Sequence, residues 1–153
     1  MGYVSRVLQP GEAVIHEARL HNVIFLPAIS LLVVAIAVLI ASLDTQGELR
    51  LALEGLAALL GLLAVLSWAR TAIRRATTEF AVTDRRIIYK VGLFARHTLE
   101  MNRGKVESVD VDQSILGRLC GFGTVIVRGT GGSLEPILYI SDPLAFRSHI
   151  TAV

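Results

Sequence analysis

The sequence has few of the residues that most chemical functions require. Its single cysteine, Cys120, excludes an intramolecular disulfide and leaves a zinc ribbon or a redox CxxC pair without its partners. Four histidines lie scattered along the chain without the HExxH spacing of a zinc site: His16, His21, His97 and His149. Aromatic residues make up only 6% and the basic residues alternate with acids, so no base-stacking platform is indicated. We therefore expect no metal, cofactor or nucleic acid, and the sequence identifies no small-molecule substrate.

Catalytic motifs are missing as well. The glycines of the GTGG stretch and of LCGFG invite comparison with a phosphate-binding loop, but neither GK[ST] nor a GxGxxG between a strand and a helix is present. No serine lies in a GxSxG pattern. Asp110 and Asp112, two residues apart on one strand, are explained equally well by a solvated strand face. The sequence predicts a protein that is not an enzyme.

Apolar residues, by contrast, are abundant at 53%, and they concentrate in two blocks. Residues 22–43 contain no ionisable side chain, and residues 51–69 contain only Glu54. Each block has about the 20 residues that a helix needs to cross a bilayer. The connection DTQGELR is short and polar, which predicts an antiparallel transmembrane hairpin over residues 22–69. The alternative, two buried helices of a soluble bundle, requires a polar stripe that residues 31–41 lack.

The flanking charges predict the orientation of this hairpin. Basic residues lie next to the outer ends of the two blocks: Arg6, Arg19, Arg70, Arg74 and Arg75. The connecting loop carries Arg50 against Asp44 and Glu48. By the positive-inside rule both termini lie in the cytoplasm. The expected domains are an N-terminal cytoplasmic segment (1–21), the hairpin (22–69) and a cytoplasmic β domain (70–153).

The pattern after residue 76 changes to the period of two that marks strands. Phe80 and Val82 alternate with Glu79, Ala81 and Thr83, which predicts a strand buried on one face. RIIYK reads as the return strand, and Leu99 and Met101 point inward from a third strand. Val106 is out of phase with the next strand, which predicts a bulge near Glu107. A short helical turn over 114–120 and two further strands, TVIVR and 136–140, complete the sheet region.

The chain ends in a short amphipathic helix. Asp142 and Pro143 form a helix start, and one face carries Phe146, His149, Ile150 and Val153. We expect this helix to close the β domain. The predicted core consists of apolar strand residues and one helix residue: Phe80, Val82, Leu99, Val109, Val111, Val125, Val127 and Phe146.

The β region has the order TEFAVTDRRIIYKVGLFARHTLEMNRGKVESVDVDQSILGRLCGFGTVIVRGTGG, followed by DPLAFR. This order resembles the bacterial pleckstrin-homology-like (PH-like) domain of YdbS-type membrane proteins. The PGE at residues 10–12, His21 and the apolar pair extend this resemblance to nearly the whole chain. It implies an α+β protein of the bacterial inner membrane, with a two-helix transmembrane hairpin and a PH-like bent β-sheet or partly open barrel capped by a C-terminal helix. It implies no enzymatic role.

Basic residues supply the candidate contact site. Those that follow the second apolar block or lie at turns and strand edges form the candidate set for headgroup or partner contact: Arg70, Arg74, Arg75, Arg85, Arg86, Lys90, Arg96, Arg103 and Lys105. One function is a membrane-anchored scaffold that binds a protein partner or its own copies. The alternative is a lipid-binding or lipid-handling component that reads anionic headgroups, although VGLFAR does not clearly reproduce the paired basic pattern of phosphoinositide-binding PH domains.

Overall fold

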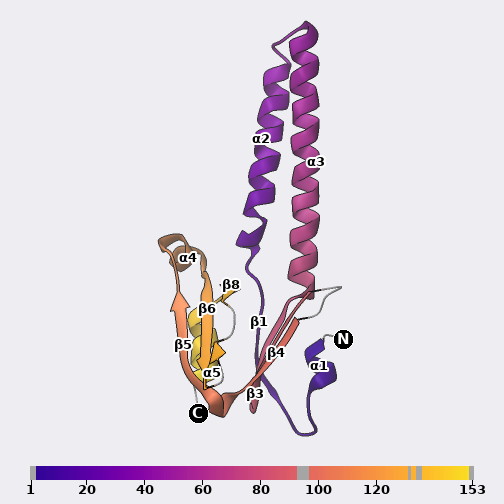
Figure 1. Cartoon of the computed structure of the whole chain (residues 1–153). Helices are drawn as coiled ribbons and strands as arrows, with labels where there is room; N and C mark the ends of the chain where they lie inside the picture. Colours follow the sequence, from indigo (N-terminus) through magenta and orange to yellow (C-terminus); the bar gives the residue numbers. More distant parts are fainter. Residues whose placement is uncertain (1–2, 93–96, 131, 134–135, 152–153) are drawn as a thin grey trace. The chain divides into compact units, whose positions relative to one another are not determined.

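The chain forms two compact units (Figure 1). The computed structural model describes residues 3–92, 97–130, 132–133 and 136–151. Unit 1 combines Met1–His21 with Arg74–Val153, and unit 2 is Asn22–Ile73. Unit 2 is therefore an insertion within the chain of unit 1.

Unit 2 is helical, as the apolar blocks predict. It contains the 3-10 turn η1 (Asn22–Phe25), α2 (Leu26–Ser42) and most of α3 (Gly47–Thr77). Both Asn22–Ser42 and Gly47–Thr77 are long and apolar enough to cross a membrane. The second helix does not end at residue 69 as predicted, because residues 70–77 contain neither glycine nor proline and the helix continues through the charged segment.

Unit 1 contains two antiparallel sheets. The first has the order β1-β2-β3-β4, with β1 (Val14–Ala18), β2 (Glu79–Thr83), β3 (Arg86–Val91) and β4 (His97–Asn102). In the second, β6 (Phe122–Gly129) pairs with β5 (Val106–Asp112), β7 (Gly132–Ser133) and β8 (Ile137–Ser141). The short helices of unit 1 are α1 (Tyr3–Val7), η2 (Arg103–Lys105), α4 (Ile115–Cys120) and α5 (Pro143–Thr151). This mixed architecture is consistent with a PH-like domain; closure of the sheets into a barrel stays a prediction.

The core of unit 1 contains every residue that the sequence predicts for it. Phe80, Val82, Val109, Val125, Val127 and Phe146 are buried, and Leu99 and Val111 pack against them. Phe146 of α5 is fully buried, and its ring lies edge-on to that of Phe80 at a centroid distance of 4.7 Å. The prediction that the last helix packs on the strands is confirmed; Val153 lies outside the described residues.

Local predictions for the loops are also confirmed. The pairing of β5 with β6 shifts register between Val106 and Ser108, which places a bulge at Glu107. The turn over 114–120 is the helix α4, capped by the Ser114 hydroxyl, which accepts a hydrogen bond from the Gly117 N–H at 3.0 Å. Gly92, directly after β3, has a positive φ of 99° that favours glycine, and residues 93–96 lie outside the described part.

The one-sided burial predicted for the first strand is wrong. Ala81 and Thr83 are as fully buried as Val82, and β3 is buried on both faces too. The cause is α1, whose Val4 forms a second apolar cluster with Ala81 and Ile88 on the other face of the sheet. Alternation in the sequence shows which residues share a face of the strand. It does not show that a distant helix, here α1, covers the face that carries Ala81.

The N-terminal residues form part of the same sheet. The strand β1, which the sequence analysis does not predict, pairs with β2 over the register Val14↔Thr83 to Ala18↔Phe80. The two apolar helices therefore lie in the connection between two neighbouring strands. Residues 1–21 belong to the β unit in this structure rather than standing apart from it.

Candidate functional site

A tight turn positions the side chain of Glu12. In the segment QPGE, the Glu12 N–H donates to the Gln9 carbonyl at 2.9 Å, with Pro10 and Gly11 between them. Gly11 has a φ of 78°, which fits a type II turn with glycine at its third position. The Glu12 carboxylate returns to accept from the Gln9 N–H at 2.8 Å. The turn thus fixes both the backbone and the side chain of Glu12.

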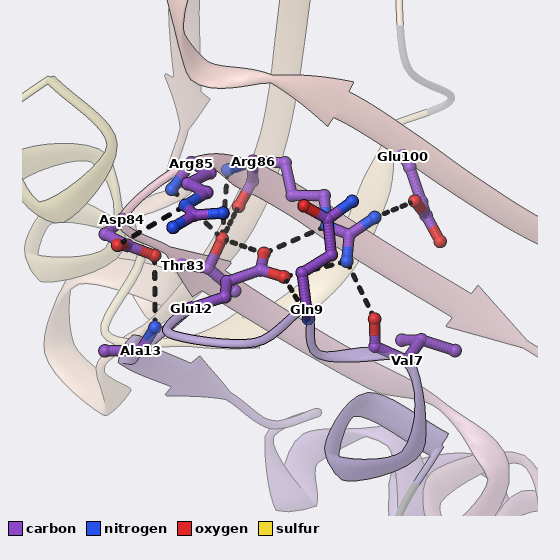
Figure 2. Close-up of polar contacts among 9 residues, drawn as sticks. All are labelled: Val7, Gln9, Glu12, Ala13, Thr83, Asp84, Arg85, Arg86 and Glu100. Atoms are coloured by element: carbon purple, nitrogen blue, oxygen red, sulfur yellow. Dashed lines mark hydrogen bonds and ion pairs between the residues drawn. The ribbon is translucent and has the colours of Figure 1, made fainter.

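Glu12 meets Arg86 in a paired contact (Figure 2). The Arg86 Nε donates to Glu12 Oε1 at 2.9 Å and its Nη2 donates to Oε2 at 2.8 Å. The Thr83 hydroxyl donates to the same carboxylate at 2.7 Å. Arg86 also binds Glu100 through Nη1 at 2.6 Å and the Val7 carbonyl through Nη2 at 2.8 Å. One guanidinium therefore joins the N-terminal segment to β3 and β4.

Burial makes this contact strong. The Glu12 side chain has no exposed surface and that of Arg86 is 16% exposed. The hydrogen bonds from Arg86, with smaller contributions from Gln9 and Thr83, lower the pKa of Glu12 to about 2 against the opposing effect of burial. The hydrogen bonds to Glu12 and the negative charge of Glu100 raise the pKa of Arg86 against the opposing effect of burial. Both groups stay charged over the physiological range, so the pair is a permanent connection and not a titrating one.

Lys90 is held in a similar way at the other end of β3. Its Nζ lies 3.4 Å from Glu79 Oε1 and 5.4 Å from the centre of the Tyr3 ring. Glu79 also accepts from the N–H groups of Tyr3 and Val4 at 2.8 and 3.0 Å, which satisfies the start of α1. Burial raises the pKa of Glu79, but these hydrogen bonds and the Lys90 charge outweigh it, so the net shift is downward. Lys90 thus contributes to holding α1 on the sheet.

Arg103 is also used inside unit 1. Its Nη2 donates to the carbonyls of His149 and Ile150, at 3.1 and 3.3 Å, at the end of α5. This satisfies carbonyls that have no partner within the helix. Three of the predicted contact residues, Arg86, Lys90 and Arg103, therefore make internal contacts that sequence reasoning missed, because their partners lie far away in the chain.

The remaining residues of the candidate set lie in different places. Arg85 is half exposed at the β2–β3 turn, and Lys105 is exposed at the end of η2. Arg70, Arg74 and Arg75 are exposed on the last two turns of α3. Arg96 lies outside the described residues. Since Arg86 and Lys90 occupy opposite ends of β3, the basic residues of the strands do not form one patch.

The described residues offer no obvious site for chemistry. In the part of the chain that the structure covers, no three His, Cys, Asp or Glu side chains lie together in a metal-binding arrangement. His16 and His149 stack with ring centroids 4.4 Å apart, and burial, with a smaller effect of His149, lowers the pKa of His16. What the arrangement does offer is a sheet unit with two apolar helices inserted in the connection between β1 and β2.

Comparison with known proteins identifies the family. The family model described as "Bacterial PH domain" matches residues 21–153, which covers both apolar helices and every strand except β1. Neither the curated proteins nor the solved structures gave a match. The matched region contains Arg86 but not its partner Glu12, so the contact in Figure 2 joins the family region to the segment before it. On the strength of this match over most of its length, the chain belongs to the bacterial PH domain family.

Proposed function

We propose that this protein is a membrane-anchored, non-catalytic interaction module. It holds its PH-like unit at the cytoplasmic face of the bacterial inner membrane, with both termini in the cytoplasm, and binds a protein partner or further copies of itself there. The two apolar helices act as the anchor. The sheet unit supplies the binding surface.

The observation that carries this proposal is the apolar surface of the two helices. Only 11% of the most apolar window of each helix is buried, so most of its aliphatic surface is open to the surroundings. Exposing this much apolar surface to water is unfavourable, at roughly 25 cal/mol per Å². A bilayer removes the penalty. Contact between the rings of Phe25 and Trp68, 6.3 Å apart, supports an antiparallel pair because it brings the start of the first span to the end of the second.

Internal contacts favour a partner-binding role over headgroup recognition. Arg86, Lys90 and Arg103 each bind groups of the same unit. A basic site for phosphate needs several cations that converge on one ligand. The alternative function, lipid recognition through the basic strand edge, retains only Arg85 and Lys105 among the described strand and turn residues of the set.

Alkaline carbonate extraction tests the anchor. We expect the full-length protein to stay in the membrane pellet, because two spanning helices are not released by high pH. Release into the supernatant would refute the hairpin. A soluble cytoplasmic protein and a protein with one known span provide the controls.

Cysteine accessibility tests the orientation. Cys120 is exposed and belongs to the unit placed in the cytoplasm, whereas Gln46 lies in the connection between the helices. In intact spheroplasts a membrane-impermeant thiol reagent should label Gln46→Cys in a Cys120→Ser background. It should not label the native protein. Labelling that depends on Cys120 would invert the topology.

A further inference from the structure

Unit 1 displays an unusual apolar helix. The aliphatic side chains of α4 are the most exposed large apolar side chains described in that unit: Ile115 is 87% exposed, Leu119 is 83% exposed and Leu116 is 67% exposed. At 100° per residue these three side chains share one side of the helix, and Gly117 lies on the opposite side. Arg118 and Cys120 are exposed on the two flanks of this apolar side. The sequence predicts the helical turn but not the exposure of its aliphatic side.

The backbone fixes α4 in this orientation. A Cβ on Gly117 would lie 2.6 Å from the Phe122 carbonyl oxygen, so the buried side of the helix rests directly on the start of β6. The Ser114 hydroxyl caps the start of α4, and Gly121, with a φ of 75°, donates its N–H to the Gly117 carbonyl at the end. The Asp142 N–H donates to the Gly121 carbonyl at 3.0 Å. The aliphatic side chains therefore cannot turn inward without breaking this packing.

The position of α4 in unit 1 shows what can cover it. Phe122, two residues after α4, stacks on the ring of His21 at 5.3 Å, and His21 donates its N–H to the Tyr139 carbonyl at 2.7 Å. His21 is the last residue of unit 1 before the first apolar helix. Tyr139 is 41% exposed, and its ring lies 6.2 Å from that of Phe122. The chain thus leaves unit 1 for the first apolar helix at the end of the sheet that carries α4.

From this placement we infer that α4 inserts Ile115, Leu116 and Leu119 into the cytoplasmic leaflet of the same bilayer that the two helices cross. The inference rests on the membrane anchoring proposed above and adds a second, peripheral contact to it. The first proposed span follows His21 directly in the chain, and the helical segment of α4 carries Arg118 but no acidic residue, which suits an anionic leaflet. The exposed Tyr139 suits the interface beside it.

The native Cys120 provides the test. The full-length protein is labelled there with bimane and reconstituted singly into nanodiscs of phosphatidylcholine and phosphatidylglycerol. Quenching by an acyl-chain nitroxide lipid and by aqueous iodide is then compared. We expect strong quenching by the lipid and protection from iodide. A triple variant, Ile115→Gln with Leu116→Gln and Leu119→Gln, should reverse both results, while Ile15→Gln, the loss of an aliphatic residue 44% exposed on β1, should leave them unchanged.

The possible outcomes separate the two proposals. If carbonate retains the protein in the pellet but iodide quenches the native protein as fully as the triple variant, α4 is not inserted and only this inference fails. If carbonate releases the protein, both proposals fail. Protection that appears only in discs loaded with several copies would show that a second copy covers α4, which overturns the inference as well. Since the native measurement needs no substitution, a folding defect of the triple variant does not prevent a decision.

Discussion

Replacing Glu12 by glutamine tests the contact that holds the N-terminal segment on the sheet. The buried carboxylate accepts hydrogen bonds from Arg86 Nε and Nη2, from the Thr83 hydroxyl and from the Gln9 N–H. Glutamine has one acceptor oxygen and an amide group that would face donors. Part of the Arg86 charge is then left without its partner. Since removing one member of a buried pair costs about 3 to 5 kcal/mol and Glu100 remains, we expect about 3 kcal/mol.

Hydrogen exchange in the full-length protein measures this loss locally. A loss of about 3 kcal/mol corresponds to roughly a hundredfold faster exchange, at about 1.4 kcal/mol per factor of ten. We expect this acceleration in β1 and β2, with unchanged exchange in the apolar helices. Glu107→Gln, at an exposed position on the bulge, is the matched control. Equal exchange of the native protein and Glu12→Gln in β1 would refute the reasoning.

The pH dependence provides an independent check of the same contact. The pKa of Glu12 is about 2 in the folded protein, below its ordinary value of 4.5. Because the folded pKa is the lower one, its stabilisation is complete above pH 4.5 and is lost as the pH falls through 2. The difference in thermal unfolding between the native protein and Glu12→Gln should therefore be constant at neutral pH and shrink in acid. A difference that grows in acid would contradict the assignment.

Three further predictions concern other parts of the molecule. Phe146→Ala should lower the free energy of unfolding of unit 1 by about 3 to 5 kcal/mol in chemical denaturation, because it empties a fully buried site; an unchanged midpoint would show that α5 does not pack there. The pKa of His16 lies below 6.5, so its stabilising effect is present above pH 6.5 and is lost as the pH falls below it; His16→Asn should flatten the pH dependence of thermal unfolding in this range, and an unaltered profile would speak against the shift. Arg70, Arg74 and Arg75 are exposed at the end of α3, and each should contribute about 1 kcal/mol of attraction to an anionic leaflet. Changing all three to Gln, with lysines added after Met1 to preserve the topology signal, should therefore reduce the quenching of unit 1 by nitroxide lipids and make it less dependent on salt. Unaltered quenching would show that these arginines act only as topogenic charges.

The sequence by itself determined the features that depend on local pattern. The two apolar blocks, the strand period and the Asp142–Pro143 helix start are read from neighbouring residues, and the structure has helices and strands at those places. The bulge at Glu107 was also visible, because one residue out of phase breaks a period of two. The predicted core residues of the strands followed from the same alternation, and Phe146 followed from the apolar face of the last helix.

Only the tertiary structure decided how distant segments meet. The strand β1 is short, and nothing in its sequence shows that its partner begins 61 residues after it ends, beyond two apolar helices. Arg86, Lys90 and Arg103 look like free surface cations because a charge pattern does not reveal partners as remote as Glu12 or the end of α5. Likewise, the exposure of Ile115, Leu116 and Leu119 depends on the contact of Gly117 with β6, which aims their side of α4 outward. Pairing and burial are long-range properties, whereas periodicity and capping are local ones.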